Sequence, residues 1–162
     1  MGVSVNVAII GDEGSGKTSL VLSAAQRTRP GDSVPVLPPT TFRVKLANEE
    51  CNCVCRDSNS ASMEEVKEVI RNCDVVLICF NMAGQTSLHS AIHVWLPRVT
   101  EIDKEIPIIM VGCKEDQAVI THTQIAVRTT FMGGVHNVPL LDPRAFHSTL
   151  HVLFVLPRMV TW

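Results

Sequence analysis

The sequence contains no tyrosine, and aromatic residues of all kinds amount to only 4%. Aromatic rings are the usual platforms on which nucleic-acid bases stack, so their scarcity argues against such a surface. Lysine and arginine do not outnumber acidic residues, and the formal net charge is −2 at pH 7, which argues against binding through a basic face. We therefore expect no nucleic-acid partner.

Long hydrophobic runs are also missing. No apolar segment approaches the roughly 20 residues that span a bilayer, so we expect no membrane span in this sequence. The first residues lead straight into an apolar strand, without the pattern of a signal peptide, and no N-x-[ST] glycosylation site occurs. We therefore expect a cytoplasmic protein whose six cysteines are reduced thiols.

Three of these cysteines alternate with other residues, at positions 51, 53 and 55. They lack the C-x-x-C pairing of zinc knuckles. A period of two places side chains on one face of a strand, so this run predicts a strand rather than a metal site. His89 and His93, and likewise His147 and His151, are four residues apart, and we interpret them as ordinary helix positions without a zinc-protease signature.

With 162 residues, 46% of them hydrophobic, the chain has room for one domain with a real core. Apolar runs predict strands, and a capping box at Ser62–Glu65 and a long amphipathic pattern with a kink at Pro97 predict helices. The expected strands are 3–10, 42–46, 51–55, 74–80 and 107–111, and the expected helices are 17–26, one from residue 62, 88–99 and a short one at 121–131. Strands that alternate with helices predict an α/β fold, with a mostly parallel sheet flanked by helices.

The stretch GDEGSGKTSL, residues 11–20, lies between the first expected strand and helix and fits the pattern G-x-x-x-x-G-K-[ST]. Such a loop cradles nucleotide phosphates: its glycines let backbone N–H groups approach, its lysine reaches the β- and γ-phosphates, and its Thr hydroxyl binds Mg²⁺. A glycine-rich turn with a solvated lysine is the alternative. The expected nucleotide-binding residues are Gly11, Glu13, Gly14, Ser15, Gly16, Lys17, Thr18 and Ser19.

The stretch VGCKED, residues 111–116, ends an expected buried strand and resembles the N-K-x-D motif of Ras-like GTPases, with Cys113 in place of Asn. A carboxylate only accepts hydrogen bonds, so Asp116 suits the two N–H donors on guanine, a pair that adenine does not offer. Lys114 would lie along the base. Because a thiol is a weak donor, Cys113 is expected to weaken binding by a few-fold to about tenfold. The alternative is a charged turn that follows a strand.

Five segments then occur in order: GDEGSGKTSL, VPVLPPTT, DVVLICF, VWLPRV and PIIMVGCKED. Together they resemble the N-terminal GTPase domain of the mitochondrial Rho (Miro) GTPases, plant type, over residues 4–116. The resemblance implies a P-loop NTPase fold of the Ras-like kind, with a GTPase core at residues 1–117. Residues 118–162 are expected to be a divergent, poorly ordered part of the same domain that lacks the last strand and helix.

The resemblance also implies roles for particular residues. Lys17 and Thr41 would be catalytic; Thr18, Thr41 (or its neighbour Thr40) and Asp57 would hold Mg²⁺, and GTP or GDP would be the ligand. Residues 29–41 and 57–62 would change with the nucleotide and contact an effector or activator protein. A place on the mitochondrial outer membrane surface would follow only if family behaviour carries over.

Several positions depart from the family pattern. Ser60 replaces the glycine of D-x-x-G, a position that also varies among the Miro proteins, and Ala61 stands where Ras-like enzymes carry a water-orienting Gln. Arg56 is expected to pair with Asp57 and compete with the metal. The guanine-contacting S-A-[KL] loop has no clear counterpart, and the EF-hands, second GTPase domain and membrane anchor of the family are not present in this sequence.

Three functions remain open from the sequence. The leading hypothesis is an enzyme, a small GTP-binding protein that hydrolyses GTP slowly. The second is a pseudo-GTPase interaction module, which Ser60, Ala61 and Cys113 favour. The third is a P-loop ATPase or nucleotide kinase, against which Asp116 counts.

Overall fold

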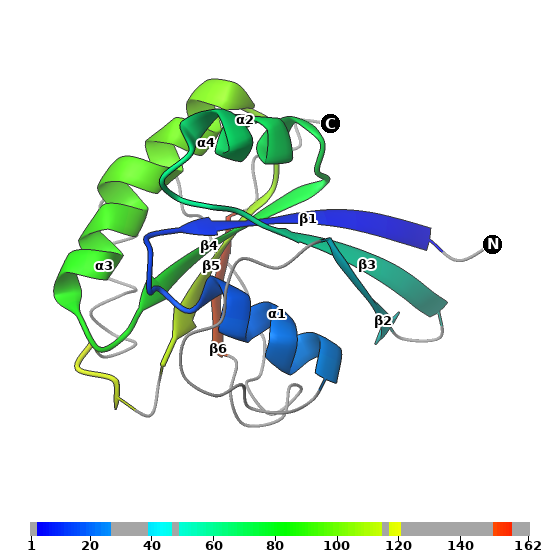
Figure 1. Cartoon of the computed structure of the whole chain (residues 1–162), viewed down its shortest axis with the longest axis horizontal. Coiled ribbons are helices and arrows are strands. Elements are labelled where there is room, and N and C mark those ends of the chain that lie inside the picture. The colour runs from blue at the N-terminus through cyan, green and yellow to red at the C-terminus, as the bar shows by residue number, and fades with distance from the viewer. Residues whose placement is uncertain (1–2, 27–38, 47–48, 115–116, 121–150, 157–162) are drawn as a thin grey trace.

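The computed structural model describes residues 3–26, 39–46, 49–114, 117–120 and 151–156 (Figure 1). Its strands are β1 (Val3–Gly11), β2 (Thr40–Leu46), β3 (Glu49–Asp57), β4 (Val75–Asn81), β5 (Ile108–Cys113) and β6 (His151–Leu156). Its helices are α1 (Lys17–Gln26), α2 (Met63–Arg71), α3 (Gln85–Ser90), the π-helical turn η1 (Ala91–Trp95) and α4 (Leu96–Ile102).

The described strands form a single six-stranded sheet in the order β2-β3-β1-β4-β5-β6. β3, β1, β4 and β5 run parallel to one another, whereas β2 pairs with β3, and β6 with β5, in the antiparallel sense. After β1 the chain passes to the edge strand β2, returns to β3 beside β1, and then continues on the other side of β1 with β4, so the strand order reverses at β1. Ligands of open α/β sheets bind at this kind of reversal, beyond the carboxyl ends of the strands.

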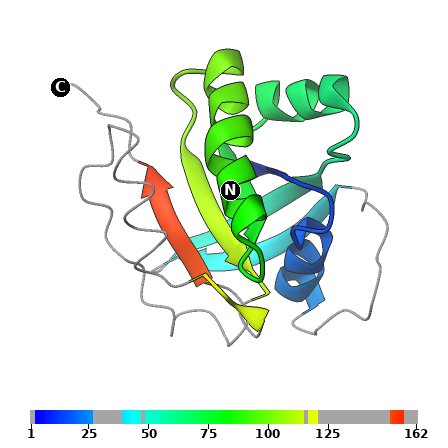
Figure 2. The same ribbon diagram turned by 90° about the vertical axis from the view of Figure 1, so that its left-hand side faces the viewer.

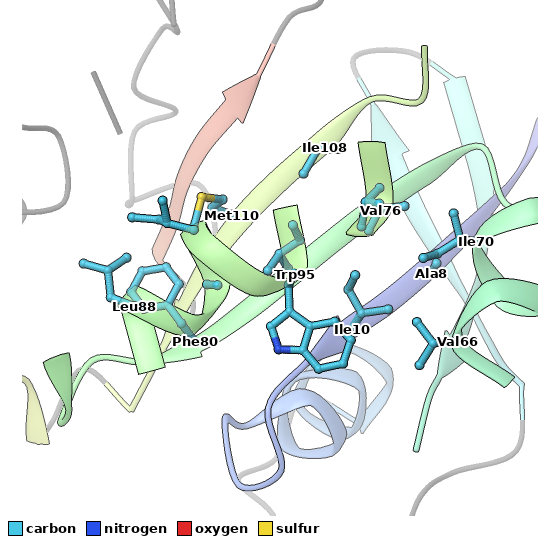
Figure 3. Packing of buried hydrophobic residues seen from close by; sticks show 14 of the residues in the cluster. Ala8, Ile10, Val66, Ile70, Val76, Phe80, Leu88, Trp95, Ile108 and Met110 are labelled. Carbon is cyan, nitrogen blue, oxygen red and sulfur yellow. The ribbon is translucent and has the colours of Figure 1, made fainter. Parts of the chain in front are cut away.

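Side chains alternate across the strands and so build an apolar core on each face of the sheet. On one face, Leu20 and Val21 of α1 pack against alternate residues of the sheet such as Val7 and Ile9. The opposite face carries the larger core, in which α2, α3, η1 and α4 cover β1, β4 and β5 (Figures 1 and 2). Figure 3 shows this larger core, with Trp95 beside Ile10 of β1.

The long helix predicted around Pro97 is present but is interrupted. Between α3 and α4 the helix widens into the π turn Ala91–Trp95, where the N–H of Leu96 donates to the carbonyl of Ala91. Proline has no N–H to donate, so a wider turn just before Pro97 accommodates the missing bond, and such turns are frequent at functional sites.

The predicted cap of α2 is confirmed. The backbone of Ser62 is extended and its hydroxyl oxygen accepts from the N–H of Glu65 at 3.5 Å. Val66 and Ile70 then point into the larger core. The Glu65 carboxylate accepts from the N–H of Asn59 at 3.4 Å and not from Ser62, so the serine half of the predicted capping box alone marks where α2 begins.

The predicted α/β fold of the Ras-like kind is confirmed. The expectation that the sheet lacks its last strand is wrong, because residues 151–156 pair with β5 along its outer edge (Figure 2). Without β6, the outer edge of β5 would present unpaired backbone N–H and C=O groups. This explains why an apolar segment from the C-terminal part pairs with β5. The helix predicted at 121–131 lies outside the described residues, and the domain division after residue 117 stays a prediction.

Within the described residues, no helix combines the length and apolar character needed to cross a membrane.

Candidate functional site

The candidate site lies where the four parallel strands end. Gly11 ends β1, Asp57 ends β3, Asn81 ends β4 and Cys113 ends β5. Because parallel strands finish at the same edge of a sheet, the register brings the glycine-rich loop, Asp57 and the VGCK segment together there. Asp57 and Cys113 therefore flank the phosphate loop that starts at Gly11, although they lie 46 and 102 positions after Gly11 in the sequence.

The phosphate loop, residues 11–18, depends on glycine at specific points. Gly11 has φ +141°, and a Cβ there would lie 2.3 Å from the carbonyl oxygen of Cys79. Gly16 has φ +107°, and a Cβ would lie 2.7 Å from the Cβ of Cys113. Side chains are excluded at both positions by backbone strain and by contact with the strands beneath, so the loop lies directly on the ends of β4 and β5.

Lys17 opens α1 and its side chain folds back over the loop. The ammonium group donates to the carbonyl oxygens of Gly11 at 2.9 Å and Asp12 at 2.7 Å. Burial lowers the pKa of Lys17, and the nearby Asp57 carboxylate opposes that shift. The Asp12 and Glu13 carboxylates oppose it as well. An ammonium held at the positive end of a helix is suited to an anionic ligand.

Thr18 and Asp57 form the candidate metal site. The Thr18 hydroxyl donates to the Asp57 carboxylate at 2.6 Å, and Asp57 is only 6% exposed. Mg²⁺ takes oxygen ligands and is commonly held by one or two carboxylates together with substrate phosphates. The residues present therefore fit Mg²⁺. In the described part of the chain, no group of three or more His, Cys, Asp or Glu side chains gathers that could hold a metal ion.

The two threonines at the start of β2 lie on different faces of the sheet. Thr40 pairs with Cys55 and Thr41 pairs with Val54. Directly paired residues point the same way, and Cys55 belongs to the face covered by α1, which Asp57 shares by alternation. Thr40 is thus the threonine on the side of the Thr18–Asp57 pair, whereas Thr41 is exposed on the other side. The metal and catalytic roles expected for Thr41 stay a prediction, and this placement favours Thr40 for them.

The segment 57–62 is held by its own polar groups. The Ser58 hydroxyl donates to the carbonyl of Ile9 at 2.8 Å, which ties the segment to β1. The Asn59 side-chain oxygen accepts from the N–H of Ala61 at 3.0 Å. Ala61 itself is exposed and has no polar side chain, so it cannot orient a water molecule. Residues 29–38 of the other predicted switch segment lie outside the described residues.

Arg56 does not take the place expected for it. It precedes Asp57 in β3, so the two side chains leave opposite faces of the sheet. Its buried Nε has no hydrogen-bond partner. Competition with a metal at Asp57 is therefore not supported by this arrangement.

The side of the site expected to hold the base is only partly described. Lys114 follows β5 with φ +60°, a left-handed conformation that is strained for a residue with a side chain and is common at functional sites. Asp116, on which the guanine prediction rests, lies outside the described residues. Residues 117–120 contact the residue that follows β4, since the N–H groups of Val119 and Ile120 both donate to the carbonyl of Met82.

Cys113 is 9% exposed and lies between the phosphate loop and Cys79. A hydrogen bond between the two thiols raises the pKa of Cys79 and lowers the pKa of Cys113, and burial adds to the rise at Cys79. A thiol at position 113, packed against Gly16, does not supply the amide donor of an Asn.

Sequence reasoning missed one element of the site. The Asp12 carboxylate accepts from the Ser90 hydroxyl at 2.8 Å and from the Trp95 indole N–H at 2.7 Å. Trp95 is 3% exposed and packs in the larger core, yet its N–H reaches the loop. The signal that was available is chemical: a buried indole needs an acceptor for its N–H.

Comparison with known proteins places this geometry in a family. Residues 6–154 match the Ras family. Over 116 residues the chain is 35% identical to mitochondrial Rho GTPase 2 of Arabidopsis thaliana, a match that covers 70% of the chain and 18% of that relative. Over 117 residues it is 32% identical to the Rho-related GTP-binding protein RhoF of Mus musculus, covering 69% of the chain and 54% of the relative.

The chain belongs to the Ras family, since the family match spans most of its length. Its similarity to both mitochondrial Rho GTPases and RhoF supports a small GTPase of the Rho/Ras type and hence binding of a guanine nucleotide. The chain spans about a fifth of the length of the mitochondrial Rho GTPases and about half of RhoF.

Proposed function

We propose that this chain binds Mg²⁺–GTP in the phosphate loop and hydrolyses it slowly to GDP, as a Miro-like switch. The observation that carries the proposal is the convergence of Lys17, Thr18 and Asp57 at the edge where the sheet order reverses. Membership of the Ras family supports guanine over adenine, and with it a GTPase over the ATPase or nucleotide kinase that the phosphate loop alone leaves open.

Each residue has a defined task in the proposed reaction. The loop's N–H groups and the start of α1 bind the phosphates, and the Lys17 ammonium moves from the Gly11 and Asp12 carbonyls to the β- and γ-phosphate oxygens. Bound Mg²⁺ would neutralise charge that develops on the phosphates. Thr18 and Asp57 are the residues that would hold it. Thr40 or Thr41 would complete the site from β2.

Hydrolysis is proposed to be slow because the protein supplies no group to orient the attacking water at Ala61. Even Ras-type enzymes with a Gln at that place turn over at about 10⁻⁴ s⁻¹ unaided. An activator that brings a polar group, in contact with residues 29–41 and 57–62, would raise the rate. An effector protein would read the same two segments.

A pseudo-GTPase is the second candidate, and the packing of Cys113 favours it. The thiol is enclosed by Gly16 and Cys79, so a donor to the base is lost at that position. Ser60 and Ala61 add to this. Such a chain would bind nucleotide without hydrolysing it and act as an interaction module.

Single-turnover hydrolysis of bound GTP separates the two candidates. We expect slow release of phosphate that Lys17→Ala and Asp57→Ala abolish, while Lys104→Ala, a change at an exposed lysine away from the loop, leaves it intact. Ala61→Gln should raise the rate by about tenfold or more if a positioned water is what is missing. Bound GTP that stays intact in both the natural chain and Ala61→Gln would establish the pseudo-GTPase instead.

The mitochondrial role rests on the relatives' names alone. The similarity to mitochondrial Rho GTPases of Arabidopsis thaliana supports a place at the mitochondrial surface, and the similarity to RhoF supports a Rho-type role elsewhere. Fractionation of cells that express the tagged full chain would decide between them: enrichment on mitochondria supports the Miro-like role, and its absence rejects it.

A further inference from the structure

The phosphate loop carries a negative charge at its second position. Asp12 directly follows Gly11, and its carboxylate belongs to the loop that is proposed to bind phosphates. A carboxylate this close to bound phosphates would repel them, and it is also a natural partner for the Lys17 ammonium. Some feature of the protein must therefore keep the carboxylate away from Lys17 and from the ligand.

The structure shows what holds it. The same carboxylate oxygen of Asp12 accepts one hydrogen bond from Ser90 and one from Trp95, at 2.8 and 2.7 Å. Both donors belong to the long helix, Ser90 at the end of α3 and Trp95 at the end of the π turn. The Lys17 ammonium instead donates to the main-chain oxygen of Asp12, at 2.7 Å.

The indole is fixed in the orientation that this requires. Trp95 is 3% exposed and packs beside Ile10 in the larger core (Figure 3). The guanidinium of Arg98 lies over its ring, 5.3 Å from the centroid, and also contacts the sulfur of Met63 at the start of α2. Close packing in the core and the contact with Arg98 restrict rotation of the indole, so its N–H stays directed at the loop.

We propose that Ser90 and Trp95 are positioning residues for nucleotide binding, which act by holding the Asp12 carboxylate away from Lys17 and the phosphates. The inference rests on the proposed nucleotide-binding function of the loop. When either donor is lost, the carboxylate is released, pairs with the Lys17 ammonium and competes with the phosphates for it. The π turn has a role in this account, because it sets the rotation of Trp95 relative to Ser90.

The test compares Trp95→Phe, which keeps an aromatic ring but removes the indole N–H, with the natural chain by titration with GDP and Mg²⁺. We expect a loss of affinity of about tenfold, as for a hydrogen bond to a charged group. In an Asp12→Ala background the competing carboxylate is gone, so the same Trp95→Phe change should alter affinity by less than about twofold. A full loss in that background, or none in the natural one, overturns the proposal.

A matched pair of hydroxyl deletions on the helix serves as the control. Ser90→Ala should weaken GDP binding and Ser90→Thr should preserve it. Thr100→Val removes a hydroxyl whose partner is the carbonyl of Pro97 within the helix, so it should leave affinity unchanged. Equal losses in Ser90→Ala and Thr100→Val would mean that the helix acts only through its stability.

Hydrogen exchange of the nucleotide-free chain tests the contact of Asp12 with Ser90 and Trp95 in the absence of a ligand. Trp95→Phe and Ser90→Ala should speed exchange of the amides of residues 12–18 by about tenfold, and Thr100→Val should not. If the natural chain binds no guanine nucleotide, the proposed function fails while this measurement still decides whether the helix holds the loop. Unchanged exchange in Trp95→Phe rejects the contact itself.

Discussion

At the scale of the residue, the phosphate loop depends on glycines whose backbone conformation disfavours any side chain. Gly14 and Gly16 both have positive φ, at +71° and +107°. They differ in their surroundings, since a Cβ at Gly14 would meet nothing within 4 Å, whereas one at Gly16 would lie 2.7 Å from Cys113. An alanine would therefore be strained at both positions by the backbone conformation, but only at Gly16 would its side chain also be crowded.

This difference gives a stability prediction. Gly16→Ala should lower the free energy of unfolding by about 3 kcal/mol or more, because backbone strain and overpacking against β5 add. Gly14→Ala should cost about 1 kcal/mol, from the left-handed backbone alone. Urea unfolding of the nucleotide-free variants measures both values. Equal losses would show that Gly16 does not lie against β5 as described.

Lys17 gives a prediction about pH. Its pKa is lowered by burial, whereas a lysine of the unfolded chain titrates near about 10.4. Between these two values the unfolded state binds more protons than the folded state, so the stability of the nucleotide-free chain should rise with pH across that window. The charged form is the one that attracts phosphates, so nucleotide affinity should fall as pH rises across it.

Unfolding and GDP titrations at a series of alkaline pH values measure the two opposite trends. Lys17→Met has no proton to lose at this position and should remove the extra rise in stability, while Lys104→Met, at an exposed site, should retain it. A rise of the same size in Lys17→Met would assign the effect to another group.

At the scale of the element, the predictable parts were those in which local chemistry sets the structure. Ser62 is followed by Glu65 and an apolar face, and α2 begins there as predicted. The π turn could not be predicted, because its apolar residues still follow a helical period and the sequence shows only Pro97 after it. Thr40 and Thr41 could not be told apart, since only the register of β2 with β3 assigns their faces.

The cap of α2 supplies a prediction at this scale. Ser62→Ala should lower the free energy of unfolding by about 1 kcal/mol, because the N–H of Glu65 loses its acceptor. Ser62→Asp keeps an acceptor at the cap and should cost little. Thermal unfolding of the two variants makes the comparison. If Ser62→Asp is as damaging as Ser62→Ala, the hydrogen bond at the cap is not what stabilises the helix start.

At the scale of the whole molecule, the site exists because four parallel strands end together. The sequence predicted the alternation of strands and helices and the phosphate loop with Lys17 and Thr18, whereas the place of Asp57 beside them was implied only by the resemblance to the Miro GTPases. It did not predict β6, because an antiparallel edge strand from residues 151–156 carries no local signal beyond its apolar composition. The Asp12–Trp95 contact joins residues 83 positions apart and depends on packing that no local pattern encodes.

The central claim is that the site at the carboxyl ends of the parallel strands binds a guanine nucleotide. Calorimetric titration of the full chain with GTP, GDP and ATP, each with and without Mg²⁺, tests it most directly. The account predicts tight binding of GTP and GDP that strengthens with Mg²⁺, together with no binding of ATP. Binding of ATP as tight as that of GTP, or no binding of any nucleotide to the folded chain, would contradict it.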